Sequence, residues 1–116
     1  MTLSYQARKR LKRIVGRHAD EAEERIRQEG HGDALATIAS NAIVDGLGED
    51  DQLKELVAIA HSAEQLANDR GTPSEDEIAD HIEEAWFSAE DAISKRAEEL
   101  QEEIVDDVLE REVIRA

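Results

Sequence analysis

The sequence predicts an all-α fold, a single domain over residues 1–116 built as a bundle of about four helices with a long C-terminal helix. Three observations predict it. Apolar residues recur at intervals of three and four along almost the whole chain, which is the spacing of one face of a helix. No stretch alternates apolar and polar residues as a half-buried strand would. Glycine-containing segments interrupt the helical pattern and divide it into separate helices. The length of 116 residues suffices for a single domain with one modest core.

The first helix is expected over residues 4–28. Its apolar residues fall on one arc of about 120°, when successive residues are placed 100° apart. Ser4 or Thr2 can cap its start, and Gly30 ends it. Gly16 lies in the middle of this helix, where Gly costs about 1 kcal/mol relative to Ala. We therefore expect a neighbouring element to pack closely against Gly16.

The second helix is expected over residues 33–45, with Asp33 as its N-cap, and the third over residues 51–68. Alanine and serine fill much of the second helix, which favours a central and tightly packed position. The third helix carries one apolar arc, and Glu64 is the one carboxylate close to that arc. We therefore expect Glu64 to be partly buried.

The fourth helix is expected over residues 73–112, after a capping box with Thr72 at the N-cap, Pro73 at the first helical position and Glu75 at the third. Ser88 could cap a second segment, but a continuous helix is favoured. From residue 73 to about residue 110, such a helix would be about 57 Å long, whereas a domain of this size has a radius of gyration of ~13 Å. Its distal part is therefore expected to pack on another copy of the chain. The predicted oligomer seam consists of Trp86, Ile93, Leu100, Ile104 and Val108.

The net charge of −15 is unevenly distributed. Residues 1–19 contain six cations and no acid, whereas the remaining residues contain 8 cations and 29 acids, a net charge of −21. The six cations spread over about 200° opposite the apolar arc of the first helix. In the first helix the basic residues come before the acidic ones, whereas the helix macrodipole favours acids near the N-terminus and bases near the C-terminus. Helix stability therefore gives no reason for this order. The predicted partner-binding face consists of Arg8, Lys9, Arg10, Lys12, Arg13 and Arg17.

Three interpretations of this basic face are open, whereas a membrane-surface helix would need bulkier residues opposite the bases, so we expect no membrane partner. The first is a solvated face whose helix forms ion pairs with the chain's own acids, such as Glu21–Arg25 and Glu23–Arg27. The second is nucleic-acid binding, which needs Lys and Arg on one face but is usually accompanied by aromatic residues among the bases. The third, which we favour, is docking on an acidic protein. Another copy is an expected partner, through its acidic segment 98–112.

Neither catalysis nor metal binding is indicated, so we expect no enzyme, no catalytic residue, no metal and no other cofactor. The chain has no Cys, and none of its serines lies in a Gly-x-Ser-x-Gly motif. The Glu-x-x-His motif of carboxylate-bridged metal sites is absent, since the Glu follows the His at His18, His61 and His81. The longest weakly polar run is too short for a membrane span and no signal sequence is recognisable, which predicts a soluble protein of the cytoplasm or of a virion.

The composition resembles that of proteins from salt-loving archaea or their viruses, with a large acidic excess, ten Arg to four Lys, and 17 Ala. In size, helix order, charge polarity and expected ordered ends, the chain resembles the small helical head-to-tail adaptor proteins of tailed viruses, which assemble as rings between portal and tail. That resemblance implies a non-enzymatic structural protein that oligomerises and bridges partner proteins. The first helix and the distal part of the fourth would be its docking elements. The alternative is a small nucleic-acid-binding protein that uses the basic first helix.

Overall fold

A computed structural model describes the backbone of residues 3–70 and 76–114 and the side chains of residues 3–66 and 81–112. The predicted all-α fold is confirmed for these residues, in which no strand occurs. The elements are α1 (Tyr5–Gln28), α2 (Asp33–Gly48), α3 (Asp51–Arg70) and α4 (Asp76–Leu109), followed by a π-helical turn over Glu110–Ile114.

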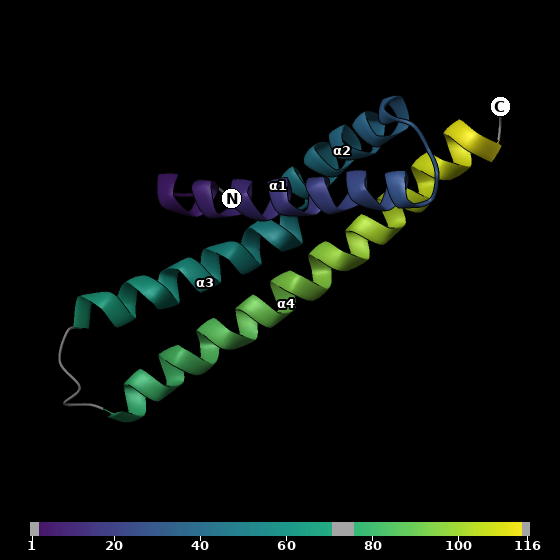
Figure 1. The fold of residues 1–116 in the computed structure, drawn as a ribbon. Helices are drawn as coiled ribbons and strands as arrows, with labels where there is room; N and C mark the ends of the chain where they lie inside the picture. The colour runs from purple at the N-terminus through teal and green to yellow at the C-terminus, as the bar shows by residue number, and fades with distance from the viewer. Residues whose placement is uncertain (1–2, 71–75, 115–116) are drawn as a thin grey trace.

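The helices form two antiparallel hairpins, α1–α2 and α3–α4, and α4 is long enough to belong to both halves of the molecule (Figure 1). It runs beside α3 and then continues to α1 and α2. The molecule measures 62 × 24 × 19 Å and its Cα radius of gyration is 17.4 Å. A compact domain of this length would have a radius near ~13 Å, so the fold is elongated along α4.

The long fourth helix is continuous through Ser88, as favoured from the sequence. Its 34 residues correspond to about 51 Å at 1.5 Å per residue. The predicted capping box over residues 72–75 lies outside the described residues. So do residues 1–2 and 115–116, on which the expected ordered ends depend.

The expectation that one chain leaves the seam of α4 without cover is wrong. Ile93 and Val108 are only 3% and 0% exposed, and Trp86, Leu100 and Ile104 are partly buried against the same core. The reason is that α1 and α2 fold onto the distal half of α4 and supply the cover that α3 alone cannot give. The seam residues therefore belong to the hydrophobic core of a single chain.

The second helix is not the central element that its small residues suggested. It buries one face against α1 and α4, whereas Ile38 and Val44 on its other side are exposed. The small side chains on the buried face of α2 allow α1 and α4 to approach it closely. Its buried residues are Ala36, Ala39, Ile43 and Leu47.

The ends of α1 follow the sequence prediction, whereas the start of α2 does not. The hydroxyl of Ser4 accepts a hydrogen bond from the backbone N–H of Ala7 at 3.2 Å, which caps α1. Gly30, just after α1, has φ of 87°, a left-handed conformation that favours glycine. At α2, Gly32 occupies the N-cap and Asp33 is the first helical residue.

Close packing against a helical glycine occurs at Gly46 and not at Gly16, contrary to the sequence prediction. A Cβ placed at Gly16 would meet no atom within 4 Å, because the residue faces outward from α1. A Cβ at Gly46 would overlap the side chain of Ile104 in α4. The absence of a side chain at Gly46 is therefore what lets α2 and α4 pack closely.

We expect Gly16→Ala to raise the free energy of unfolding by about 1 kcal/mol, because Ala favours the helix and its methyl group meets no neighbour. Gly46→Ala should give a smaller gain or a loss, since the side chain of Ile104 must move aside. Urea unfolding followed by circular dichroism measures both effects. Equal gains in the two variants would show that the Gly46 contact does not constrain the packing of α2 on α4.

Candidate protein-docking site

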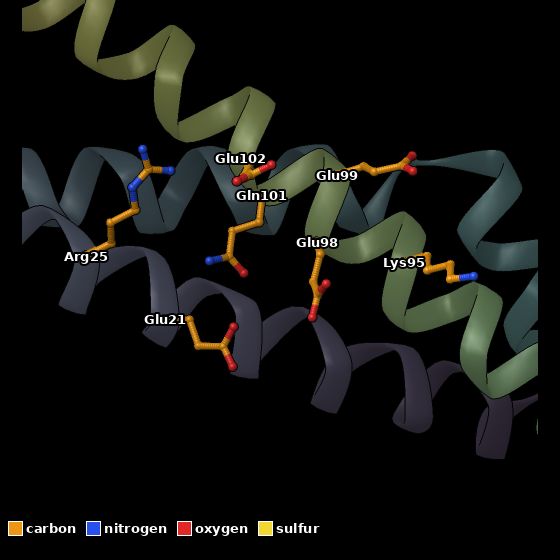
Figure 2. Close-up of a pocket in the computed structure, with 7 residues that line it drawn as sticks. All are labelled: Glu21, Arg25, Lys95, Glu98, Glu99, Gln101 and Glu102. Atoms are coloured by element: carbon orange, nitrogen blue, oxygen red, sulfur yellow. The ribbon is translucent and has the colours of Figure 1, made fainter.

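A hollow with an acidic lining lies between α1 and α4, with a volume of about 510 Å³ (Figure 2). Glu98 is directed from α4 toward α1 in Figure 2, and Glu21 faces the same space from α1. We call this hollow the acidic groove. Its lining residues are Glu21 and Arg25 of α1 and Lys95, Glu98, Glu99, Gln101 and Glu102 of α4.

Both cations of the acidic groove form ion pairs with carboxylates that do not line it. Arg25 pairs with Asp106 at 3.0 Å, and Lys95 pairs with Asp91 at 3.3 Å. By contrast, three of the groove's carboxylates form no ion pair with any described residue: Glu98, Glu99 and Glu102. The groove therefore keeps an unneutralised negative charge.

One side of the acidic groove is held in place by a buried histidine. His18 is 6% exposed, and its Nδ1 lies 2.6 Å from Oε1 of Gln101, within hydrogen-bond distance of the amide oxygen. Oε2 of Glu21 lies 3.6 Å from the same nitrogen. His18 is thus a buried link between α1 and α4.

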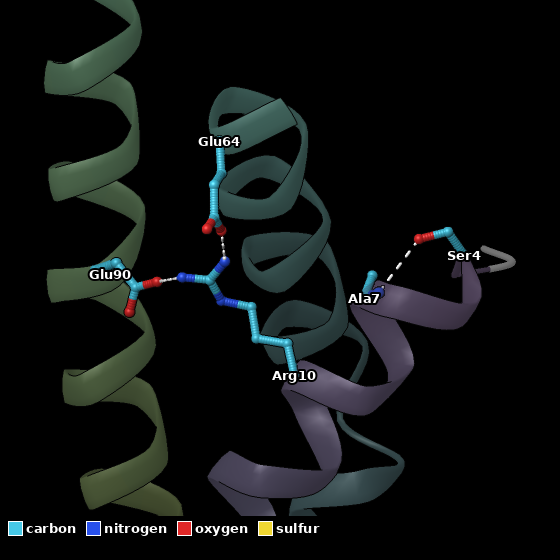
Figure 3. Close-up of polar contacts among 5 residues, drawn as sticks. All are labelled: Ser4, Ala7, Arg10, Glu64 and Glu90. Atoms are coloured by element: carbon cyan, nitrogen blue, oxygen red, sulfur yellow. Dashed lines mark hydrogen bonds and ion pairs between the residues drawn. The ribbon is translucent and has the colours of Figure 1, made fainter. Parts of the chain in front are cut away.

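Arg10, predicted as part of the partner-binding face, is instead taken up by the fold. Its guanidinium reaches carboxylates of both Glu64 in α3 and Glu90 in α4 (Figure 3), and its side chain is 19% exposed. Glu64 itself is 49% exposed, which is more than its expected partial burial. Arg10 is therefore an electrostatic link between three helices.

The other predicted cations are exposed on the surface of α1. Arg17 pairs with Glu21 at 3.4 Å, one turn along the helix, and Nζ of Lys9 lies 4.9 Å from the centre of the exposed Tyr5 ring. Four cations of α1 form no ion pair with any described residue: Arg8, Lys9, Lys12 and Arg13.

Three of these cations line a hollow of about 520 Å³ whose walls come from α1 alone, which we call the basic hollow. It consists of Gln6, Lys9, Lys12 and Arg13. Lys9 and Arg13 are four residues apart on the same side of the helix, where like charges destabilise it by about 0.2–0.5 kcal/mol. The fold neither buries nor neutralises these charges, so the basic hollow is a candidate docking site.

The expected i,i+4 ion pairs occur in part. Nη1 of Arg27 lies 3.6 Å from a carboxylate oxygen of Glu23, as predicted. Arg25 pairs with Glu29 at 4.0 Å rather than with Glu21, which pairs with Arg17. Ion pairing within α1 thus accounts for the cations of its second half, whereas in its first half only Arg10 is taken up by pairing, with acids of α3 and α4, among the described residues.

A further ion pair, which the sequence did not single out, joins the start of α3 to α4. Arg96 donates two hydrogen bonds to Asp50, at 2.8 and 3.1 Å, and the backbone N–H of Leu53 donates a third at 2.9 Å. Asp50 therefore caps α3 and anchors α4 at once. The hydrogen bonds from Arg96 and then from Leu53 lower the pKa of Asp50, although burial acts in the opposite direction.

We expect the wild type to lose more stability than Asp50→Asn as the pH falls from neutral to about 3. The folded-state pKa of Asp50 is below its unfolded value, so its contribution is present above about pH 4 and is lost as the pH falls through the folded-state pKa. Asn keeps the capping acceptor but not the charge. Urea unfolding at several pH values measures the difference, and parallel losses in both proteins would contradict this role for Asp50.

An apolar hollow of about 530 Å³ lies between α3 and α4. Ile59 and Leu66, which the sequence placed on the apolar arc of the third helix, line it and are exposed. The reason is that Ala58, Ala63 and Ala85 beside them are small and leave the hollow open.

Within the described ranges, no group of three or more His, Asp or Glu side chains is placed to hold a metal ion. No helix in the same ranges is both long and apolar enough to cross a membrane. Comparison of the chain with protein-family models, with curated proteins and with solved structures gave no match. What the chain does is therefore inferred from the charge, exposure and geometry of its own residues.

Proposed function

We propose that this chain is a non-enzymatic assembly protein that forms oligomers and docks on acidic protein surfaces through the exposed basic face of α1. The observation that carries the proposal is the set of four exposed cations that form no ion pair with any described residue, in a chain of net charge −15. With 29 acids available, folding could have neutralised these cations internally, as it does for Arg10. An acidic partner would relieve their mutual repulsion and set the orientation of docking.

Nucleic acid is the competing ligand. One observation favours it, since the exposed ring of Tyr5 lies beside Lys9 and could stack on a base next to a phosphate contact. Against it, the cations spread more widely around α1 than a stripe that binds a groove of nucleic acid. Absorbance spectra of the purified protein distinguish a nucleic-acid ligand from a protein partner, because bound nucleic acid adds its own ultraviolet absorbance to that of the protein.

In its narrower form, the proposal identifies the oligomer as a ring-shaped head-to-tail adaptor of a virion, from a virus whose host lives in concentrated salt. The size of the chain, the order of its helices and the segregation of charge along α1 support this form, as does the acidic composition. Electron microscopy of negatively stained particles tests it directly, since a head-to-tail contact that closes on itself gives rings of constant diameter.

We expect light scattering to give a mass well above the 12.9 kDa of one chain, in potassium chloride of about 0.15 M, where the Debye length is about 8 Å. Arg13→Glu should lower that mass, because it reverses a charge in the basic hollow. Arg111→Glu is the matched control, since it makes the same charge change at an exposed cation of the π-helical turn. A monomer at every concentration would overturn the proposal.

We also expect the melting temperature to rise as potassium chloride increases from about 0.1 M to about 1 M, because the Debye length falls from about 10 Å to about 3 Å. Shorter screening lengths weaken the repulsion among the 29 acids in the folded chain. Circular dichroism melts measure the shift. A melting temperature that falls or stays constant over this range would contradict adaptation to concentrated salt.

A further inference from the structure

We infer that the acidic surface on which the basic hollow docks is the acidic groove of a second copy of this chain. In this contact, Lys9 and Arg13 of one copy pair with Glu98 and Glu102 of another. The inference rests on the proposed function, and it adds the identity of the partner and of the contacting residues.

The first support is the equal spacing of the opposing charges. Lys9 and Arg13 are four residues apart on α1, and Glu98 and Glu102 are four residues apart on α4. Each pair thus presents its charges about 6 Å apart along a straight helix. Two helices laid side by side can therefore form both ion pairs in a single register.

The second support is the balance of unpaired charge. The basic hollow contributes three cations without ion pairs, and the acidic groove contributes three carboxylates without ion pairs among the described residues. Arg25 and Lys95 do not change this balance, because both are engaged by other carboxylates.

The third support is that each chain carries both complementary surfaces, at separate places on one helix. Helix α1 lines both hollows, the basic one at residues 6–13 and the acidic one at residues 21–25. The centres of the two stretches are about 20 Å apart along one continuous helix. Two copies can therefore bring unlike surfaces together, either reciprocally about a twofold axis or by head-to-tail repetition.

Charge reversal tests the contact in the full chain. The basic-hollow variant carries Lys9→Glu and Arg13→Glu, and the groove variant carries Glu98→Lys and Glu102→Lys. All four residues are exposed, so circular dichroism should show unchanged helical content. We expect light scattering to give a monomer of 12.9 kDa for each variant alone and the wild-type mass for their equimolar mixture, because mixing restores every opposite-charge pair.

A control variant with Glu83→Lys and Glu84→Lys makes the same charge change on α4 at exposed residues outside the groove. It should keep the wild-type mass alone and should not restore the mass of the basic-hollow variant when the two are mixed. If a reversed variant fails to fold, Glu98→Gln with Glu102→Gln provides the test, since loss of the two charges should still lower the mass.

The outcomes separate the inference from the proposed function. If light scattering gives a lower mass for the basic-hollow variant and the wild-type mass for the groove variant, the basic face docks on a surface other than the acidic groove. That result supports the proposed function and overturns the inference. Failure of the mixture to regain mass overturns it as well. A wild type that is monomeric under all conditions overturns the proposed function and the inference together.

Discussion

The constraint on which the structure depends is the length of α4. A helix of 34 residues with apolar side chains along one side cannot be covered by one neighbour, because α3 has only 20 residues. The first half of α4 therefore packs on α3, and the second half needs the α1–α2 hairpin. That requirement fixes the elongated shape, brings Gly46 against Ile104, and places α1 beside the acidic residues of α4.

Electrostatics then determine how the few cations of this acidic chain are used. Arg10, Arg25 and Arg96 each link helices that are distant in the sequence, by pairing with acids of α3, α4 or the residue before α3. Such cross-links oppose the repulsion that a net charge of −15 creates. Lys9 and Arg13 make no such link to any described residue, so their charges are available on the surface of α1.

The sequence predicted the helices well, because helix formation depends on residues close along the chain. The spacing of apolar residues gave the four helices, and Ser4 and Gly30 marked the ends of α1 as they do in the structure. The same spacing identified Ile93 and Val108 as residues that need cover, but a second copy and the chain's own α1–α2 hairpin would bury them equally well. Periodicity alone could not decide between those two sources of cover.

The features that sequence reasoning missed all depend on contacts between distant residues. Arg10 lies at the edge of the apolar arc, which was a local sign that it could be partly covered, but its acids are 54 and 80 positions away, so its partners could not be identified from the sequence. The acidic groove likewise combines residues of α1 and α4, although the acid pairs at 98–99 and 102–103 were a visible signal. The sequence could therefore predict that one surface of the first helix is basic. Which of its cations remain exposed could be learned only from the structure.

The charge order along α1 has a consequence for how fast a partner is captured. Its first half is positive and its second half carries most of its acids, so the dipole of the side chains has the same direction as that of the helix backbone and adds to it. An approaching molecule with a complementary field is turned toward the correct orientation before any atoms touch, which raises the encounter rate. Since this steering acts only within about a Debye length, dissolved salt controls the speed of recognition as well as its strength.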